Sequence, residues 1–125
     1  MIKYEQSTGA IYLDDKLLCK YPDSYSGFGN GRNNPAYEKV PDCGPIPKGV
    51  WYIARWYPQY EGKGALVARL VPKFITETYG RAGFLIHGDS IERPGQGSHG
   101  CIIAPLAVRR ILATSLGSDN WLAVI

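Results

Sequence analysis

Residues 84–103 read FLIHGDSIERPGQGSHGCII, and the interpretation of the chain starts from this stretch. It opens with a short apolar run, Phe84 to Ile86, which is typical of a buried strand, and that strand is expected to end at His87. It closes around Cys101. Because His87 and His99 are the only two histidines of the chain, the groups that titrate near pH 7 are concentrated here.

Cys101 has the surroundings that a nucleophilic thiol requires. A thiol is activated when an imidazole, a positive charge or a helix N-terminus favours its thiolate form. The sequence offers His87 and His99, Arg93 in the connecting loop, and a helix expected to begin near Pro105. We therefore interpret Cys101 as a nucleophile and His87 as its base. The alternative is an ordinary buried cysteine, since free Cys is among the most buried residue types.

The tripeptide before the cysteine predicts a specialised backbone. Gly100 allows close approach of a substrate and can turn successive N–H groups toward one point, so an oxyanion hole for acyl transfer is expected here. Ser98 is expected either to support the base through its hydroxyl or to form a turn. His99 is expected to position the loop or hold a substrate carboxylate, with a purely structural role as the alternative.

A family resemblance follows from these residues. His87-Gly88-Asp89 followed by Ser98-His99-Gly100-Cys101-Ile102 resembles the active-site motif of L,D-transpeptidases. In that family the cysteine accepts the acyl group, the upstream histidine is the base, and a backbone carbonyl beside the histidine orients its ring. The resemblance implies these roles for Cys101, His87 and the Gly88 carbonyl, with no cofactor and no metal.

The stretch upstream extends the match. Residues 25–27 (YSG), 33–35 (NNP) and 44–53 (GPIPKGVWYI) resemble the compact branch that includes type VI secretion L,D-transpeptidase effectors. The resemblance covers roughly residues 25 to 105. It implies peptidoglycan stem peptides as the substrate, the periplasm of a target bacterium as the place of action, and a secretion apparatus and an immunity protein as partners.

Two departures from that pattern shape the expected reaction. The loop between His87 and Ser98 is shorter than in secreted L,D-transpeptidases, and Ile103 stands where many of them carry an arginine. These departures favour removal or exchange of the terminal D-alanine of a stem tetrapeptide over cross-linking.

Three further residues are candidates for contacts with the substrate, namely Asp89, Arg93 and Tyr25. The alternatives are a turn role for Asp89, also weighed as a carboxylate that orients the imidazole, and a place in the core for Tyr25.

The whole chain is expected to form one catalytic domain, residues 1–125, that is mainly β. Fifteen glycines and nine prolines indicate short strands joined by turns. Strands are expected over residues 3–6, 10–13 and 17–21, which form an antiparallel meander, and over 84–86 and 121–125. Two more, over 50–57 and 65–71, are expected to form a hairpin across the turn Gly62-Lys63-Gly64. By resemblance the architecture is a compact L,D-transpeptidase-like β-sandwich or barrel-like sheet with one or two short helices.

One helix is expected to begin at Pro105 and to end at Gly117. Its apolar face would hold Val108, Ile111, Leu112 and Leu116, with Arg109 and Arg110 as flanking polar positions.

Composition and cysteine spacing exclude several classes. A net charge of +3 is too small to indicate nucleic acid, and no apolar run is long enough to span a membrane. The N-terminus lacks the apolar core of a signal peptide, so synthesis in the cytoplasm without a classical export signal is expected. The spacing of Cys19, Cys43 and Cys101 is not that of metal ligands. Cys19 and Cys43 are expected to pack in the fold, with a disulfide between them as the alternative.

Two other functions are weighed against the enzyme. One is a metal site built from His87, His99 and Cys101, for which a convincing fourth ligand is missing. The other is a non-catalytic module that binds the cell wall. Cysteine peptidases in which the cysteine precedes the histidine are disfavoured, because here the histidine comes first.

Overall fold

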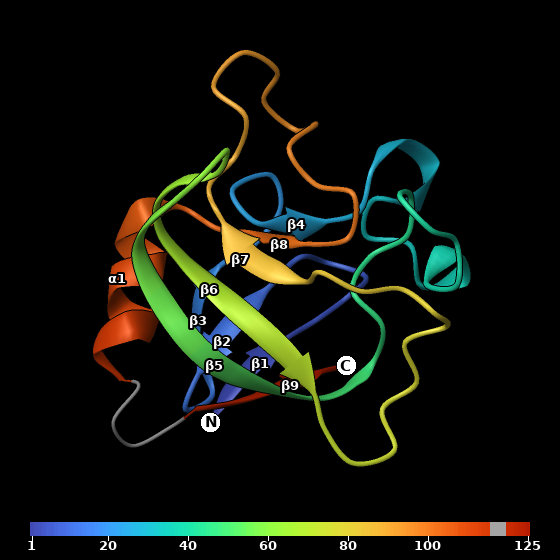
Figure 1. Ribbon diagram of the computed structural model, residues 1–125, viewed down its shortest axis with the longest axis horizontal. Coiled ribbons are helices and arrows are strands. Elements are labelled where there is room, and N and C mark those ends of the chain that lie inside the picture. The colour runs from blue at the N-terminus through green and yellow to red at the C-terminus, as the bar shows by residue number, and fades with distance from the viewer. Residues whose placement is uncertain (116–119) are drawn as a thin grey trace.

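The computed structural model describes residues 1–115 and 120–125 and is mainly β, as the sequence predicts (Figure 1). Its strands are β1 (Ile2–Tyr4), β2 (Ile11–Leu13), β3 (Lys16–Cys19), β4 (Tyr25–Ser26), β5 (Gly49–Tyr60), β6 (Gly64–Pro72), β7 (Leu85–His87), β8 (Ile102–Ile103) and β9 (Trp121–Val124). One α-helix, α1 (Leu106–Thr114), stands among the described residues, together with the 3₁₀ turns η1 (Gly29–Gly31) and η2 (Pro35–Tyr37).

The nine strands form a single sheet in the order β3-β2-β1-β9-β5-β6-β7-β8-β4. The expected N-terminal meander and the β5–β6 hairpin are confirmed, and both hairpin strands run longer than predicted. Strand β9 lies parallel to β1 and antiparallel to β5, so it connects the meander to the hairpin. In the described part of the chain β3 and β4 do not pair with each other, and the sheet is therefore open.

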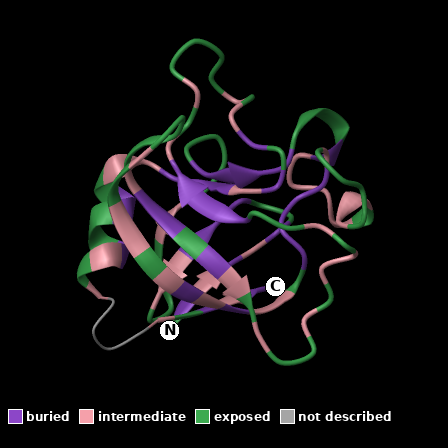
Figure 2. Cartoon of the chain, in the orientation of Figure 1, coloured by how far each residue is buried: buried purple, intermediate pink, exposed green. Residues whose placement is uncertain are grey.

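The sheet curls around one hydrophobic core. Apolar side chains from seven of the nine strands and from α1 pack in a single cluster that includes Trp51, Phe84, Ile86 and Leu112. In Figure 2 the buried residues follow β4, β7, β8 and the middle of β6, where Val67, Ala68 and Leu70 are buried, whereas the β5–β6 turn is exposed and the loop after β7 is mostly exposed. The β5–β6 turn and the loop after β7 thus project from the packed core.

Helix α1 differs from its predicted pattern at two positions. Val108 and Leu112 face the core as expected, but Ile111 is 43% exposed. Arg109, expected at a flanking polar position, is buried because its guanidinium donates to three backbone carbonyls, those of Ala65, Leu66 and Ala104. The helix ends at Thr114. The expected helical residues Leu116 and Gly117 lie outside the described residues.

The glycine-rich segment 22–49 contributes the edge of the sheet next to β8. Strand β4 pairs with β8 in antiparallel register, Tyr25 with Ile103 and Ser26 with Ile102. The Ser26 hydroxyl donates to the Gly100 carbonyl at 3.0 Å and accepts the Ile46 N–H at 2.9 Å. This segment therefore supports the backbone around the cysteine. Cys19 and Cys43 carry free thiols, so the disulfide between them is not formed.

Candidate active site

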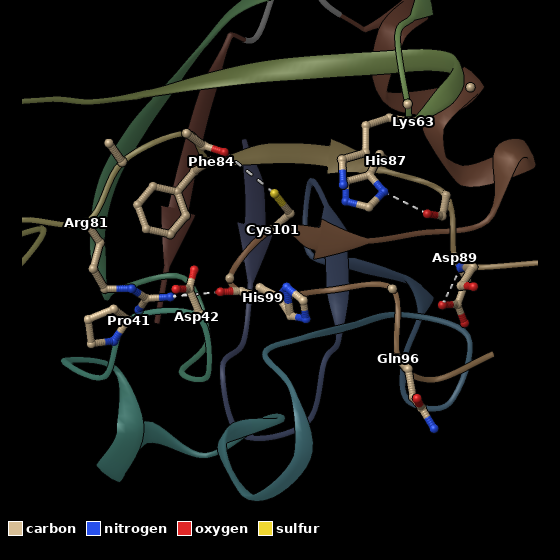
Figure 3. Close-up of a pocket in the computed structure, with 18 of the residues that line it drawn as sticks. Pro41, Asp42, Lys63, Arg81, Phe84, His87, Asp89, Gln96, His99 and Cys101 are labelled. Atoms are coloured by element: carbon tan, nitrogen blue, oxygen red, sulfur yellow. Dashed lines mark hydrogen bonds between the residues drawn. The ribbon is translucent and has the colours of Figure 1, made fainter. Parts of the chain in front are cut away.

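A groove of about 780 Å³ lies along β7, lined by Phe84 just before this strand, His87 at its end and Cys101 just before β8 (Figure 3). It lies between the β5–β6 turn, the loop after β7 and the segment around Pro41. Six of the predicted site residues line it, namely His87, Gly88, Asp89, His99, Gly100 and Cys101. The lining residues that were not predicted as site residues include Lys63, Arg81 and Phe84.

The register of β7 and β8 places His87 and Cys101 on one face of the sheet. The two strands are parallel neighbours, with Ile86 opposite Ile102. Alternate residues of a strand share a face, so Leu85 and His87 point the same way, and Cys101, one position before Ile102, lies across from Leu85. Figure 3 shows the His87 and Cys101 side chains pointing into the same groove.

The His87 ring is fixed by one hydrogen bond and leaves one nitrogen free. Its Nδ1 lies 2.7 Å from the Gly88 carbonyl oxygen, the carbonyl that the motif implied. Because a carbonyl only accepts, Nδ1 carries the proton and Nε2 holds a lone pair. Nε2 is buried and has no hydrogen-bond partner. Burial is the main cause that lowers the pKa of His87 from 6.5 to about 4, so the ring is neutral near pH 7.

The Cys101 sulfur is partly exposed and lies 3.7 Å from the Gly83 carbonyl oxygen. Burial raises the pKa of the thiol above its ordinary value, while the Leu85 backbone N–H and the charges of Lys63 and Arg81 act in the opposite direction. The resting pair is therefore a thiol and a neutral imidazole.

No hydrogen bond joins His87 Nε2 to the Cys101 sulfur among the described residues. A base that takes the thiol proton must come within hydrogen-bonding reach of the sulfur, and that contact is not made in the resting geometry. The reason is the register, which offsets the two side chains by two residues, and the direction of the thiol, which points to the Gly83 carbonyl.

Ser98 organises the backbone before the cysteine rather than the base. Its buried hydroxyl accepts the N–H groups of Gly27 at 2.9 Å and Gly100 at 3.1 Å, and it donates to the Cys101 carbonyl. The turn role is therefore the one observed, and no bond reaches His87. The Gly100 N–H donates to this hydroxyl, and the oxyanion hole expected around Gly100 stays a prediction.

Asp89 lines the groove, and its hydrogen bonds stabilise the loop after β7. Its carboxylate accepts the Tyr25 hydroxyl and the N–H groups of Ser90 and Gly95. It has no bond to the His87 ring, and the turn interpretation of Asp89 matches this geometry. Tyr25 itself is completely buried beneath the loop, where its hydroxyl also accepts the Gly97 N–H at 2.8 Å. Tyr25 thus packs as a core aromatic and does not line the groove.

Arg93 and His99 are exposed and lie apart from the base. Arg93 does not line the groove, and the cations that act on the Cys101 thiol are Lys63 and Arg81 instead. The His99 ring lines the groove and packs edge-to-face on Phe28, with centroids 5.0 Å apart. Within residues 1–115 and 120–125 no three His, Cys, Asp or Glu side chains are grouped so as to hold a metal, which removes support for the metal alternative.

Arg81 was not singled out in the sequence, and its role is visible only in three dimensions. It donates to the carbonyls of Glu38, Gly44 and Pro45 at 2.6–2.8 Å and to that of His99 at 3.3 Å. It links the segment 38–45 to the residue before Gly100. No local pattern marks it, because all its partners are backbone carbonyls distant in sequence.

A known protein family matches most of this chain. The model of the Tlde1 domain matches residues 21–120, which are 100 of the 125 residues. The chain belongs to the Tlde1 domain family. This assignment confirms the resemblance to type VI L,D-transpeptidase effectors that the motifs around Cys101 indicated.

Solved structures share the fold of this Tlde1 domain. The catalytic domain of the Enterococcus faecium L,D-transpeptidase has a TM-score of 0.54 and 22% identity, over 99% of this chain and 95% of that one. L,D-transpeptidases from Stackebrandtia nassauensis (TM-score 0.57, 16% identity) and Mycobacterium tuberculosis (TM-score 0.54, 13% identity) match over 99% and 98% of this chain. The chain spans only 54% and 60% of those two. No curated protein matches the sequence.

Family and fold together support an enzyme of the L,D-transpeptidase type that acts on peptidoglycan. Among the described residues, no helix of the Tlde1 domain combines the length and the apolar character needed to cross a membrane.

Proposed function

We propose that this protein removes or exchanges the terminal D-alanine of peptidoglycan stem tetrapeptides through a thioester on Cys101. The observation that carries the proposal is the buried, unpartnered Nε2 of a neutral His87, which faces the groove that the Cys101 thiol shares. A buried nitrogen with a free lone pair is costly for stability, and a general base requires such a lone pair.

The first half of the reaction forms the acyl-enzyme. His87 Nε2 takes the thiol proton as the Cys101 sulfur attacks the carbonyl carbon of the amide between the third residue, meso-diaminopimelate, and D-alanine. The C–N bond then breaks, and the proton on Nε2 passes to the leaving amine of D-alanine. The third residue stays on the sulfur as a thioester.

The second half restores the free thiol. Water or the amine of another D-amino acid attacks the thioester carbon, and His87 takes a proton from the attacking group and returns it to the sulfur. Water gives a tripeptide, and an amine gives an exchanged tetrapeptide. The short loop 88–97 and Ile103 favour these small acceptors over a second stem peptide.

The place of action is part of the proposal. The membership in the Tlde1 domain family supports the proposal of an antibacterial effector. We propose that it acts in the periplasm of a target cell and that an immunity protein protects the producer.

The test compares wild type with Cys101→Ala on purified tetrapeptide muropeptides, with and without D-methionine. Mass spectrometry is expected to show tripeptide in water and a D-methionine product when the amine is present, both only with wild type. Equal product from Cys101→Ala would contradict the proposal. Binding to sacculi without any change in their muropeptides would favour the non-catalytic module.

A further inference from the structure

Lys63 is a cation of the groove that the sequence predicts only as part of a turn. It occupies the turn between β5 and β6, flanked by Gly62 and Gly64, which adopt φ of 79° and 88°. The turn lines the groove, and in Figure 3 the Lys63 side chain extends from it toward His87. A lysine at the end of a hairpin ordinarily points to bulk solvent, so this direction is informative.

The Lys63 ammonium acts on both reacting groups. Lys63, His87 and Cys101 line the same groove, and the charge of Lys63 acts to lower the pKa of both reacting groups, although burial raises the pKa of Cys101 overall. Within the described residues no hydrogen bond or salt bridge engages its Nζ. The charge is therefore available to a ligand in the groove.

The other groove cation is not available in the same way. Both Nη atoms of Arg81 already donate to backbone carbonyls, so moving it toward a ligand would break those bonds. Lys63 is thus the cation of the groove that can meet an anion without disrupting the fold.

The hairpin end that carries Lys63 is held in place by Arg109. The Arg109 guanidinium donates to the carbonyls of Ala65 and Leu66, just after the turn. The same guanidinium lies against Gly88, where an added Cβ would be 2.7 Å from Nη2. The Arg109 guanidinium of α1 therefore contacts both the end of the β5–β6 turn and Gly88, the residue after His87. These contacts fix the position of Lys63 relative to His87.

We infer that Lys63 is a specificity-determining residue that binds the terminal α-carboxylate of the stem peptide, an inference that rests on the proposed function. In the acylation step the scissile carbonyl carbon lies at the Cys101 sulfur. The terminal carboxylate is then one residue away, and consecutive Cα atoms are about 3.8 Å apart. A cation beside both Cys101 and His87 is within reach of that carboxylate. Lys63 would accordingly select chains that end at the fourth residue.

The stem offers other carboxylates, on its second and third residues, so the test separates the sources. Four substrates are compared: the free tetrapeptide, the tetrapeptide that ends in D-alaninamide, and the two tetrapeptides amidated on the second or on the third residue. The variants are Lys63→Met, Lys63→Arg as the conservative replacement, and Lys16→Met as a matched control on exposed β3, far from the groove.

The effect of Lys63→Met is expected to depend on the free terminal carboxylate of the substrate. Lys63→Met lowers kcat/KM for every substrate with a free terminal carboxylate by about 10- to 100-fold, mainly through KM, and leaves D-alaninamide release unchanged. Lys63→Arg retains most of the activity, Lys16→Met retains all of it, and added salt shrinks the difference because the pair is exposed. An equal loss on the D-alaninamide substrate would overturn the inference, as would no loss at all. A loss that disappears when another carboxylate is amidated would also overturn it.

A binding measurement keeps this inference separate from catalysis. Titration calorimetry of the free and D-alaninamide tetrapeptides is done on Cys101→Ala and on Cys101→Ala combined with Lys63→Met. Tighter binding of the free tetrapeptide that depends on Lys63 supports the inference, even if no variant turns over. Equal affinities overturn it, even if turnover occurs.

Discussion

His87 has a low affinity for protons because its ring is almost fully buried, with 3% of its surface exposed, and lies near the charges of Lys63 and Arg109. The carbonyl of Gly88 opposes this effect but is the smaller cause. At the scale of the residue, the outcome is a base that stays unprotonated well below neutral pH.

The pH dependence of the enzyme follows from that property. Protonation of Nε2 abolishes the base, so kcat/KM is expected to fall on the acid side through the pKa of His87, about 4, rather than through 6.5. The rate should stay level down to about pH 5. Initial rates of D-alanine release between about pH 3.5 and 8 measure it, with return to neutral pH as the control for unfolding. An acid limb centred near 6.5 would show that the ring is solvated.

Ser98 gives a second prediction at this scale. Ser98→Ala removes the acceptor for two buried N–H groups, those of Gly27 and Gly100, and the donor to the Cys101 carbonyl. The free energy of unfolding is expected to fall by about 1 to 3 kcal/mol, and kcat to fall with it as the cysteine segment loosens. Urea unfolding and steady-state kinetics check this, with exposed Ser7→Ala as the control. Full stability in Ser98→Ala would contradict the assigned hydrogen bonds.

At the scale of the element, α1 and the β5–β6 hairpin are joined through Arg109. Arg109→Met leaves the carbonyls of Ala65, Leu66 and Ala104 without their donor and is expected to cost about 2 to 4 kcal/mol of stability. The neighbouring Arg110→Met is the matched control, because Arg110 is exposed. Denaturant unfolding of both variants measures the difference. Equal stability of the two would show that the guanidinium contributes nothing.

The elements also show how far the sequence alone can go. Alternation and turn residues were sufficient for the meander, the hairpin, β7 and β9, because each is set by local pattern. The helical pattern did not predict the burial of Arg109, because a polar residue on that face is normally solvated. Its partners are backbone carbonyls of β6, which the pattern of the helix does not contain. Lys63 was taken only as part of a turn for the same reason.

In the candidate site, too, local features were predicted from the sequence and long-range contacts were not. The motif fixed which residues stand near the cysteine and anticipated the Gly88 carbonyl on Nδ1. It did not reveal that Ser98 bonds to Gly27 or that Asp89 bonds to Tyr25, because β4 reaches the site from residues more than 60 positions away. Contacts of that kind depend on sheet order, which local pattern does not encode.

At the scale of the whole molecule, sheet order brings the functional parts to one edge. Strand β4, from the first quarter of the chain, pairs with β8, while β6 pairs with β7 beside the hairpin turn that carries Lys63 (Figure 1). The groove thus takes residues from segments that lie far apart in sequence, around a core shared by seven strands and α1. His87, Cys101 and Lys63 thus come together in one groove.

The last prediction concerns where this molecule acts. If tetrapeptide stems are its substrate, it is harmless inside the cytoplasm and harmful where the cell wall is. Expression of residues 1–125 in a Gram-negative host is expected to arrest growth when a fused export signal directs them to the periplasm, and only with Cys101 intact. Growth curves and muropeptide profiles measure it, with exported Cys101→Ala as the control for burden on export. Tripeptide stems should accumulate in the arrested cells because water resolves the thioester. Arrest by exported Cys101→Ala, or by wild type kept in the cytoplasm, would place the toxicity elsewhere than in this reaction.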